Sequence, residues 1–292
     1  MPEYVVTEPG VYDIPEDAYH LDPVKGGSLS YSGAKKLLAE GGPELFAYER
    51  EHPPEPSKEM ELGTAAHKLV LGVGQELHVV DAKDWTTRAA KEEREQARVA
   101  GMLPLLPKEL ATVTAMAARL REHKRASQIL AQPGRAEMSA FWEDPAFGIW
   151  WRCRWDHMPE PDPRYQPVIG DYKTTAKGGA SKREFSKAIA SYHYNLQASV
   201  YTAGYAAMFD DRISVPPGYA LITQERVAPY RVAVYELHPD ALRKGRQDAE
   251  RAMEIYRDNR EAEAEGRPGA WPGYSPEIEV IDLPYWAYRD EY

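Results

Sequence analysis

Three stretches between residues 135 and 173 constrain most strongly how this chain can fold. Residues 135–142, 148–156 and 166–173 are rich in aromatic and β-branched side chains, and Pro, Gly or Asp residues bound them. This pattern is typical of consecutive strands. Because helix-like segments precede and follow these stretches, we expect an α/β (α+β) fold with a mixed central β-sheet flanked by helices.

The flanking sequence supplies the other elements of this fold. A short helix is expected from Ser30 or Ser32 to about Glu40, where either serine can cap it. Residues 1–27 hold many Pro, Gly and acidic residues and are expected to form an irregular arm before a single domain at 28–292. That domain divides into a mainly helical part at 28–131, a catalytic sheet with its helices at 132–237, and a C-terminal helix and tail at 238–292. Further helices are predicted at 58–71, 107–131 with a break near Lys124, 181–190, 193–208 and 239–265, and further strands at 76–80, 218–225 and 230–236.

Composition narrows the class of protein. The chain has 292 residues, of which 43% are hydrophobic, so it can form a sizeable core. It has no run of 18 or more apolar residues and no basic-then-apolar start, so we expect a cytoplasmic protein without a membrane span. Cys153 is the only cysteine, which excludes an internal disulfide and cysteine-ligated zinc or iron–sulfur sites.

The third strand-like stretch, PVIGDYKTT, places two reactive groups together. Side chains alternate across a strand, so Asp171 and Lys173 share a face and Tyr172 points to the other. A carboxylate can hold a divalent cation, and a lysine can orient or deprotonate a water, or offset charge on a phosphate. The simpler interpretation is a surface ion pair, worth under about 1 kcal/mol. The apolar context favours a functional role, because buried charges need partners.

The preceding stretch, IWWRCRWD, ends in a carboxylate. Asp156 shares a face with Arg152 and Arg154, whereas Cys153 and Trp155 lie on the opposite face and are expected in the core. If this strand pairs with the next, Asp156 meets the acid of PVIGDYKTT. Two carboxylates with water and phosphate oxygens make a typical Mg²⁺ or Mn²⁺ site.

Two predicted helices carry polar pairs four residues apart, which places each pair on one helical face. Gly63 lets another backbone or DNA approach, and His67 can supply a third metal ligand. Gln197 and Tyr201 are candidates for contacting the metal-bound water or the phosphate backbone. Taken alone, each pair is more often an ordinary core or surface feature.

The order and spacing of these elements resemble a nuclease series. The sequence resembles the RecB-type PD-(D/E)XK nucleases, whose motifs run G-x-x-x-H, D, D-x-K-T and Q-x-x-x-Y, and among them the RecE (exonuclease VIII) branch of phages and prophages. The resemblance extends over about residues 28 to 288. One departure is that no Pro precedes the first Asp. The matching positions are Gly63 with His67, then Asp156, then Asp171 with Lys173 and Thr174, then Gln197 with Tyr201.

The resemblance implies a restriction-endonuclease-like core with helical N-terminal additions. It also implies an enzyme that digests linear double-stranded DNA from its ends in the 5′→3′ direction, releasing 5′-mononucleotides and leaving 3′ single-stranded tails. Its implied partners are a RecT-like single-strand annealing protein and, in a ring tetramer, further copies of the chain. The implied ligands of Mg²⁺ or Mn²⁺ are His67, Asp156, Asp171 and the Tyr172 carbonyl. Lys173 is the implied catalytic lysine, supported by Gln197 and Tyr201. Glu137 matches an acidic position of the family that assists a second metal or the DNA end.

Two alternative functions share the fold. One is an endonuclease or repair nuclease, and the other is a DNA-binding protein with a degenerate nuclease core. The net charge of −10 argues against a generic nucleic-acid coat, but a nuclease needs only a local basic groove. Such a groove can draw on Lys177, Lys182, Arg183 and Lys187, although an exposed helix face explains them nearly as well.

A competing catalytic motif lies near the N-terminus. Ser32 and Lys35 fit the S-x-x-K of serine β-lactamases, but the companion motifs of those enzymes are missing or only approximate. We therefore interpret Ser32 as a helix cap. The chain has no G-x-x-x-x-G-K-[ST] motif, so DNA cutting should not require ATP.

Overall fold

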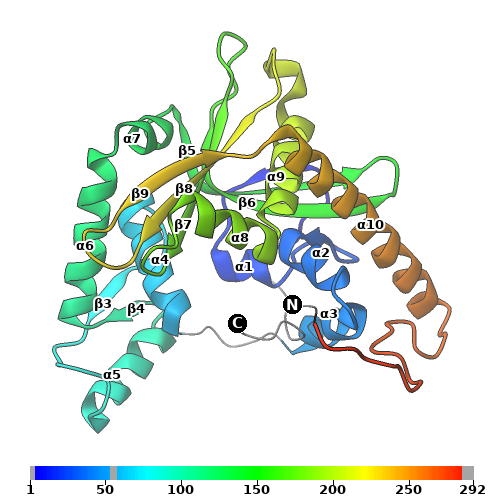
Figure 1. Ribbon diagram of the computed structural model, residues 1–292, viewed down its shortest axis with the longest axis horizontal. Helices are drawn as coiled ribbons and strands as arrows, with labels where there is room; N and C mark the ends of the chain where they lie inside the picture. The colour runs from blue at the N-terminus through cyan, green and yellow to red at the C-terminus, as the bar shows by residue number, and fades with distance from the viewer. Residues whose placement is uncertain (1–3, 53–57, 285–292) are drawn as a thin grey trace, which may run out of the picture.

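The computed structural model describes residues 4–52 and 58–284, and its centre is one seven-stranded sheet (Figure 1). Its strands are β1 (Gly10–Tyr12), β2 (Leu29–Ser30), β5 (Gly134–Asp144), β6 (Ile149–Pro159), β7 (Val168–Thr175), β8 (Gly218–Glu225) and β9 (Val232–Glu236). Their order is β1–β5–β6–β7–β8–β9, with β2 beside β6. The β7–β8 and β2–β6 pairs are parallel and the others antiparallel, which confirms the predicted mixed sheet.

Helices cover both faces of this sheet. The helices of the described chain are α1 (Glu16–His20), α2 (Tyr31–Leu37), α3 (Gly42–Glu51), α4 (Lys58–Leu71), α5 (Arg88–Val99), α6 (Pro107–Glu122), α7 (Lys124–Leu130), α8 (Lys182–Tyr192), α9 (Tyr194–Phe209) and α10 (Pro239–Ala264). Apolar residues of α2, α8, α9 and α10 form the core on one face, together with Trp155. Those of α4, α6 and α7 form the core on the other face, with Tyr172. Two core layers therefore enclose the strands that carry the predicted site.

Alternation along β6 explains why this segment forms a central strand. Trp151, Cys153 and Trp155 are buried, while Arg152 and Arg154 are partly exposed. The two arginines face the N-terminal segment rather than the main core. The face assignment made from the sequence is confirmed.

The N-terminal segment is not the irregular arm that the sequence predicts. Residues 10–12 form β1, which pairs with β5, and α1 follows it, with Tyr19 beside Phe141 of β5 and Arg152 of β6 (Figure 1). Buried Val6, Ile14, Tyr19 and Val24 pack with Phe141 in a small core of their own. These elements are too short to show a strand or helix period, so apolar residues spaced among Pro and Gly gave no signal.

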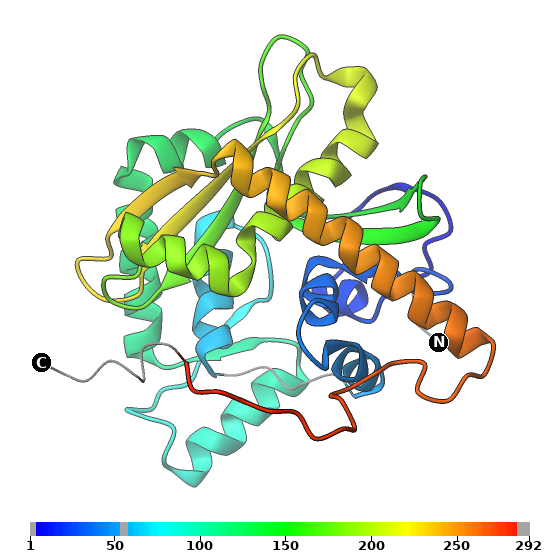
Figure 2. The ribbon, with the colours of Figure 1, turned by 45° about the vertical axis from the view of Figure 1, so that its right-hand side comes forward.

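Two smaller features also differ from the sequence predictions. Ser30, not Ser32, caps α2, because its hydroxyl accepts a hydrogen bond from the Gly33 N–H at 3.1 Å. Residues 103–105 form an unpredicted strand, β4 (Leu103–Leu105), which pairs with β3 (Leu77–Val79) in a separate two-stranded sheet. After α10, the described chain runs to residue 284 without another helix or strand, as Figure 2 shows in orange and red. Residues 285–292 of the predicted tail lie outside the described part of the chain.

In the described residues, every helix is too short or too polar to cross a membrane.

Candidate metal-dependent active site

The candidate site lies where β6 and β7 part. The two strands pair at His157 and Gly170, and Asp156 and Asp171 are the next residues along each strand. Beyond this pair, the Asp156 carboxylate occupies the place of a backbone partner. Its Oδ2 accepts a hydrogen bond from the Tyr172 N–H at 2.7 Å. The gap between the strands thus brings both predicted acids to one point of the sheet.

Three side chains gather around this gap closely enough to hold one ion. Potential ligand atoms of His67, Glu137 and Asp156 all lie within 4.8 Å of one another. Helix α4 contributes His67, whose Nδ1 lies 3.6 Å from Asp156 Oδ2. Two carboxylates with an imidazole are a donor set that can hold a divalent cation such as Mg²⁺ or Mn²⁺. The donors present therefore fit the implied metal.

Glu137 reaches this trio through an unusual backbone conformation. It lies opposite Asp156 in β5 with φ 57°, and the regular pairs on either side are Ala136 with His157 and Met138 with Trp155. A left-handed conformation at a residue other than glycine costs about 1–3 kcal/mol and is typical of functional sites. The backbone strain therefore lies at one of the candidate metal ligands.

Arg154 holds the Glu137 side chain. Its Nε donates to Glu137 Oε2 at 2.7 Å, and the same guanidinium donates to the Ile14 carbonyl and the Ser139 hydroxyl, each at 2.9 Å. The side chains of Arg154 and Glu137 are only 15% and 21% exposed. This ion pair links the metal trio to the N-terminal segment.

Asp171 lies outside this trio and is held by two other predicted residues. Lys173 Nζ lies 2.7 Å from Asp171 Oδ2, and Gln197 Nε2 donates to Asp171 Oδ1 at 3.0 Å. Asp171 is 1% exposed, so both contacts are shielded from solvent. The structure therefore brings Asp171, Lys173 and Gln197 together as a second group beside the first.

The remaining predicted positions have different surroundings. The Tyr172 N–H points into the gap, and because the N–H and C=O of a strand residue point to the same side, its carbonyl faces the gap as well. Tyr201 is buried one turn beyond Gln197 and packs edge-on against Tyr219. A Cβ at Gly63 would meet only Thr174 Oγ1, at 3.7 Å. The close approach expected at this glycine is therefore not made by another part of the described protein.

The charge states of the trio follow from its burial. Burial lowers the pKa of His67 and the Lys173 ammonium lowers it further, which favours the neutral imidazole that binds metal. Burial and then the Asp171 charge raise the pKa of Asp156 to about 7. Burial and then Asp156 raise the pKa of Glu137, against the opposing effect of Arg154. The closely spaced acids repel one another, and a divalent cation would relieve that repulsion.

Lys173 remains protonated in this environment. Burial alone would lower its pKa, but Asp171 and Asp156 together raise it above the ordinary value. The ammonium also lies 5.1 Å from the centre of the Tyr194 ring, a cation–π contact. Tyr194 is a site residue that the sequence analysis did not single out. Its position three residues before Gln197, on the same helical face, was the available signal.

Comparisons with known proteins agree with this geometry. A family model described as a PDDEXK-like domain of unknown function (DUF3799) matches residues 30–284. The comparison with curated proteins gave no match. Among solved structures, the chain is similar to a crystal structure of a proposed exonuclease from Eubacterium rectale, with a TM-score of 0.57 and 13% identity over 88% of this chain and 90% of that chain. That likeness shows a shared fold, and the family match, which spans most of the sequence, shows that this chain belongs to the PDDEXK-like domain family.

Proposed function

We propose that this protein is a metal-dependent exonuclease that degrades linear double-stranded DNA in the 5′→3′ direction. The observation that carries the proposal is the pair of adjoining groups at the gap between β6 and β7. One is the trio of candidate metal ligands, His67, Glu137 and Asp156, and the other is the ion pair of Asp171 and Lys173. An acid-rich site that binds a cation beside a buried ammonium suits the hydrolysis of a phosphodiester.

The residues of the chain divide the work of hydrolysis. A divalent cation, Mg²⁺ or Mn²⁺, would polarise the scissile phosphate and lower the pKa of a bound water. Asp156 would hold this cation, and the further candidate ligands are His67, Glu137, Asp171 and the Tyr172 carbonyl. Asp171 and Asp156 raise the pKa of Lys173, which favours an ammonium that orients the attacking water or offsets charge on the phosphate over an amine that accepts a proton. Gln197 fixes the Asp171 carboxylate, and Asp171 in turn fixes Lys173. Attack at phosphorus with loss of the 3′-oxygen gives 5′-mononucleotides.

Two observations favour an exonuclease over the alternatives. The series from Gly63 to Tyr201 resembles the RecE branch, and the structural neighbour is described as a proposed exonuclease. Both acids and the lysine are present, Lys173 contacts Asp171, and Asp156 accepts a hydrogen bond from the Tyr172 N–H between them, which argues against a degenerate DNA-binding protein. On the same resemblance we propose a RecT-like single-strand annealing protein and further copies of this chain, in a ring, as partners.

The test is digestion of matched linear and covalently closed circular duplexes with Mg²⁺ and without ATP. The expected result is release of 5′-mononucleotides from the linear DNA and survival of the circle, because an exonuclease requires an end. Linear substrates with 5′-phosphate or 5′-hydroxyl ends, labelled at either terminus, report polarity. Cutting of the circle would instead support the endonuclease, and a linear duplex left intact would contradict the proposal.

A further inference from the structure

A row of stacked groups leads from Lys173 to the protein surface. The Lys173 ammonium lies over the Tyr194 ring, and the Tyr194 and Tyr192 rings stack with centroids 5.6 Å apart and planes inclined by 26°. Lys35 Nζ, from α2, lies 6.0 Å from the Tyr192 centroid. An aromatic surface is therefore connected to the candidate catalytic lysine by direct contacts.

Tyr192 is held in place although its side chain is accessible. It ends α8 and is 54% exposed. Its carbonyl accepts a hydrogen bond from the Tyr31 hydroxyl, and Tyr194 supports one side of its ring. A single exposed tyrosine needs no explanation. Tyr192 differs, because contacts from two elements fix it one ring away from Lys173.

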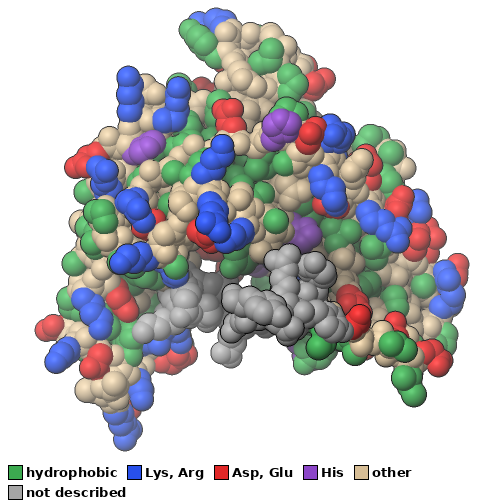
Figure 3. Space-filling model, viewed as in Figure 1, with side chains coloured by type: hydrophobic (Ala, Val, Ile, Leu, Met, Phe, Trp, Pro, Cys, Tyr) green, Lys and Arg blue, Asp and Glu red, His purple; other side chains and the backbone are tan. Residues whose placement is uncertain are grey.

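Positive charge on the same helix suits a polyanion. Lys182, Arg183 and Lys187 lie exposed on α8, the last two beside Glu184, and Figure 3 shows Lys and Arg side chains over this helix. Lys35 has a long, flexible stem that can reach a phosphate. Aromatic rings next to cations are the usual means of holding a nucleic-acid strand without reading its sequence.

We propose that Tyr192 is a stacking platform for the terminal nucleobase of the DNA end, and that Lys35 binds a neighbouring phosphate. The inference rests on the proposed exonuclease function and deepens it. Inside a duplex both faces of each base are covered by neighbouring bases, so only the end presents a free face to the ring. The platform would therefore select an end of any sequence and place it beside Lys173.

The test compares Tyr192→Ala with Tyr192→Phe, which keeps the aromatic face, and with Tyr165→Ala. Tyr165 is a matched control, because it is 67% exposed and lies beside a cation, Arg164, at 5.5 Å, but in the connection between β6 and β7. Each protein is mixed in EDTA with a linear duplex that carries 2-aminopurine at its end, whose fluorescence falls when the base stacks. The wild type, Tyr192→Phe and Tyr165→Ala should quench it, and Tyr192→Ala should not.

Steady-state cutting with Mg²⁺ gives the second readout. We expect the KM of Tyr192→Ala for linear duplex to rise roughly tenfold with kcat changed less than twofold, while Tyr192→Phe and Tyr165→Ala keep the wild-type values. Tyr192→Leu, which keeps apolar bulk without a ring, should behave as Tyr192→Ala, so a folding defect of the alanine variant does not decide the outcome. Equal quenching and equal KM in wild type and both ring-less variants would overturn the platform alone. A wild-type protein that cuts no DNA would refute the proposed function itself.

Discussion

The backbone N–H of Tyr172 donates a hydrogen bond to the Asp156 carboxylate at 2.7 Å, at the point where β6 and β7 stop pairing. This bond takes the place of a backbone hydrogen bond between the strands, so the Tyr172 N–H still has a partner. It also fixes Asp156 against the strand that carries Asp171 and Lys173. Asp156 and Asp171 are 15 residues apart in the sequence, and the Tyr172 N–H joins the strands that carry them into one site.

Asp156→Asn should stabilise the protein without metal at alkaline pH. Burial and the Asp171 charge raise the pKa of Asp156 to about 7, so the folded protein binds this proton more tightly than the unfolded chain does. The free energy of unfolding therefore falls as the pH rises from the pKa of the unfolded chain, about 4, to above 7. In EDTA we expect the Tm of Asp156→Asn to exceed that of the wild type by a few degrees at pH 8 and by much less at pH 5.

Asp162→Asn is the control for that experiment. Asp162 is partly exposed, and hydrogen bonds from the side chain and then the backbone of Arg164 lower its pKa to about 2, so the variant should gain no stability at high pH. If the Tm of Asp156→Asn exceeds that of the wild type by the same amount at pH 5 and at pH 8, the inferred repulsion between Asp156 and Asp171 is wrong.

The pair of Arg154 and Glu137 should behave as one unit in stability measurements. Arg154→Met leaves a largely buried carboxylate without its partner, which should cost roughly 2 kcal/mol, between the values for exposed and fully buried pairs. Adding Glu137→Gln should then cost little more, so a double-mutant cycle in urea should show strong coupling.

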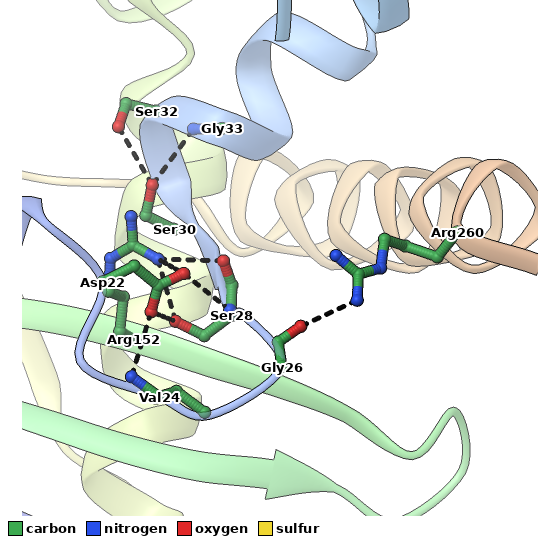
Figure 4. A network of polar contacts seen from close by, with 9 residues as sticks. All are labelled: Asp22, Val24, Gly26, Ser28, Ser30, Ser32, Gly33, Arg152 and Arg260. Atoms are coloured by element: carbon green, nitrogen blue, oxygen red, sulfur yellow. Dashed lines mark hydrogen bonds and ion pairs between the residues drawn. The ribbon is translucent and has the colours of Figure 1, made fainter. Parts of the chain in front are cut away.

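Arg152 supplies the matched control for this cycle. It shares a face of β6 with Arg154 and also holds the N-terminal segment, but through Asp22 and Ser28, as Figure 4 shows. Arg152→Met combined with Glu137→Gln should therefore be additive. Equal coupling for both arginines would mean that Arg154 has no special relationship with Glu137.

The sequence predicts the main sheet and the site motifs because their signals are local. Alternation across IWWRCRWD places Arg154 and Asp156 on one face, and the structure has them there. The break in the 107–131 helix is also found, between α6 and α7. Helix 58–71 and the strands on either side of residue 228 follow from the same short-range periodicities.

The remaining features depend on contacts between distant segments. Glu137 lies close to His67 and Asp156, and its backbone has a positive φ opposite Asp156. No residue pattern in β5 predicts this backbone conformation. Strand β1 is recognisable only by its pairing with β5. The stack of Tyr192 on Tyr194 likewise requires the tight α8–α9 junction at His193, which adopts φ 57°.

Metal binding should depend on His67. Calorimetric titration of Mn²⁺ into protein freed of metal with EDTA should show binding to the wild type, and His67→Ala should weaken it at least roughly tenfold because an imidazole ligand is lost. The control is His78→Ala, since His78 is partly buried and bonded to Glu93 but lies in the small β3–β4 sheet. Undiminished Mn²⁺ binding by His67→Ala would remove this residue from the ligand set.

The most direct test of the nuclease assignment is the rate at which Lys173→Met digests end-labelled linear duplex with Mg²⁺. Loss of the ammonium beside Asp171 removes stabilisation of the developing charge and should lower the rate by about 10²–10³-fold, while binding of the same duplex in EDTA stays within a few-fold of the wild type. Lys108→Met, which removes an exposed lysine of α6, should leave both unchanged. Digestion by Lys173→Met at the wild-type rate would contradict the account.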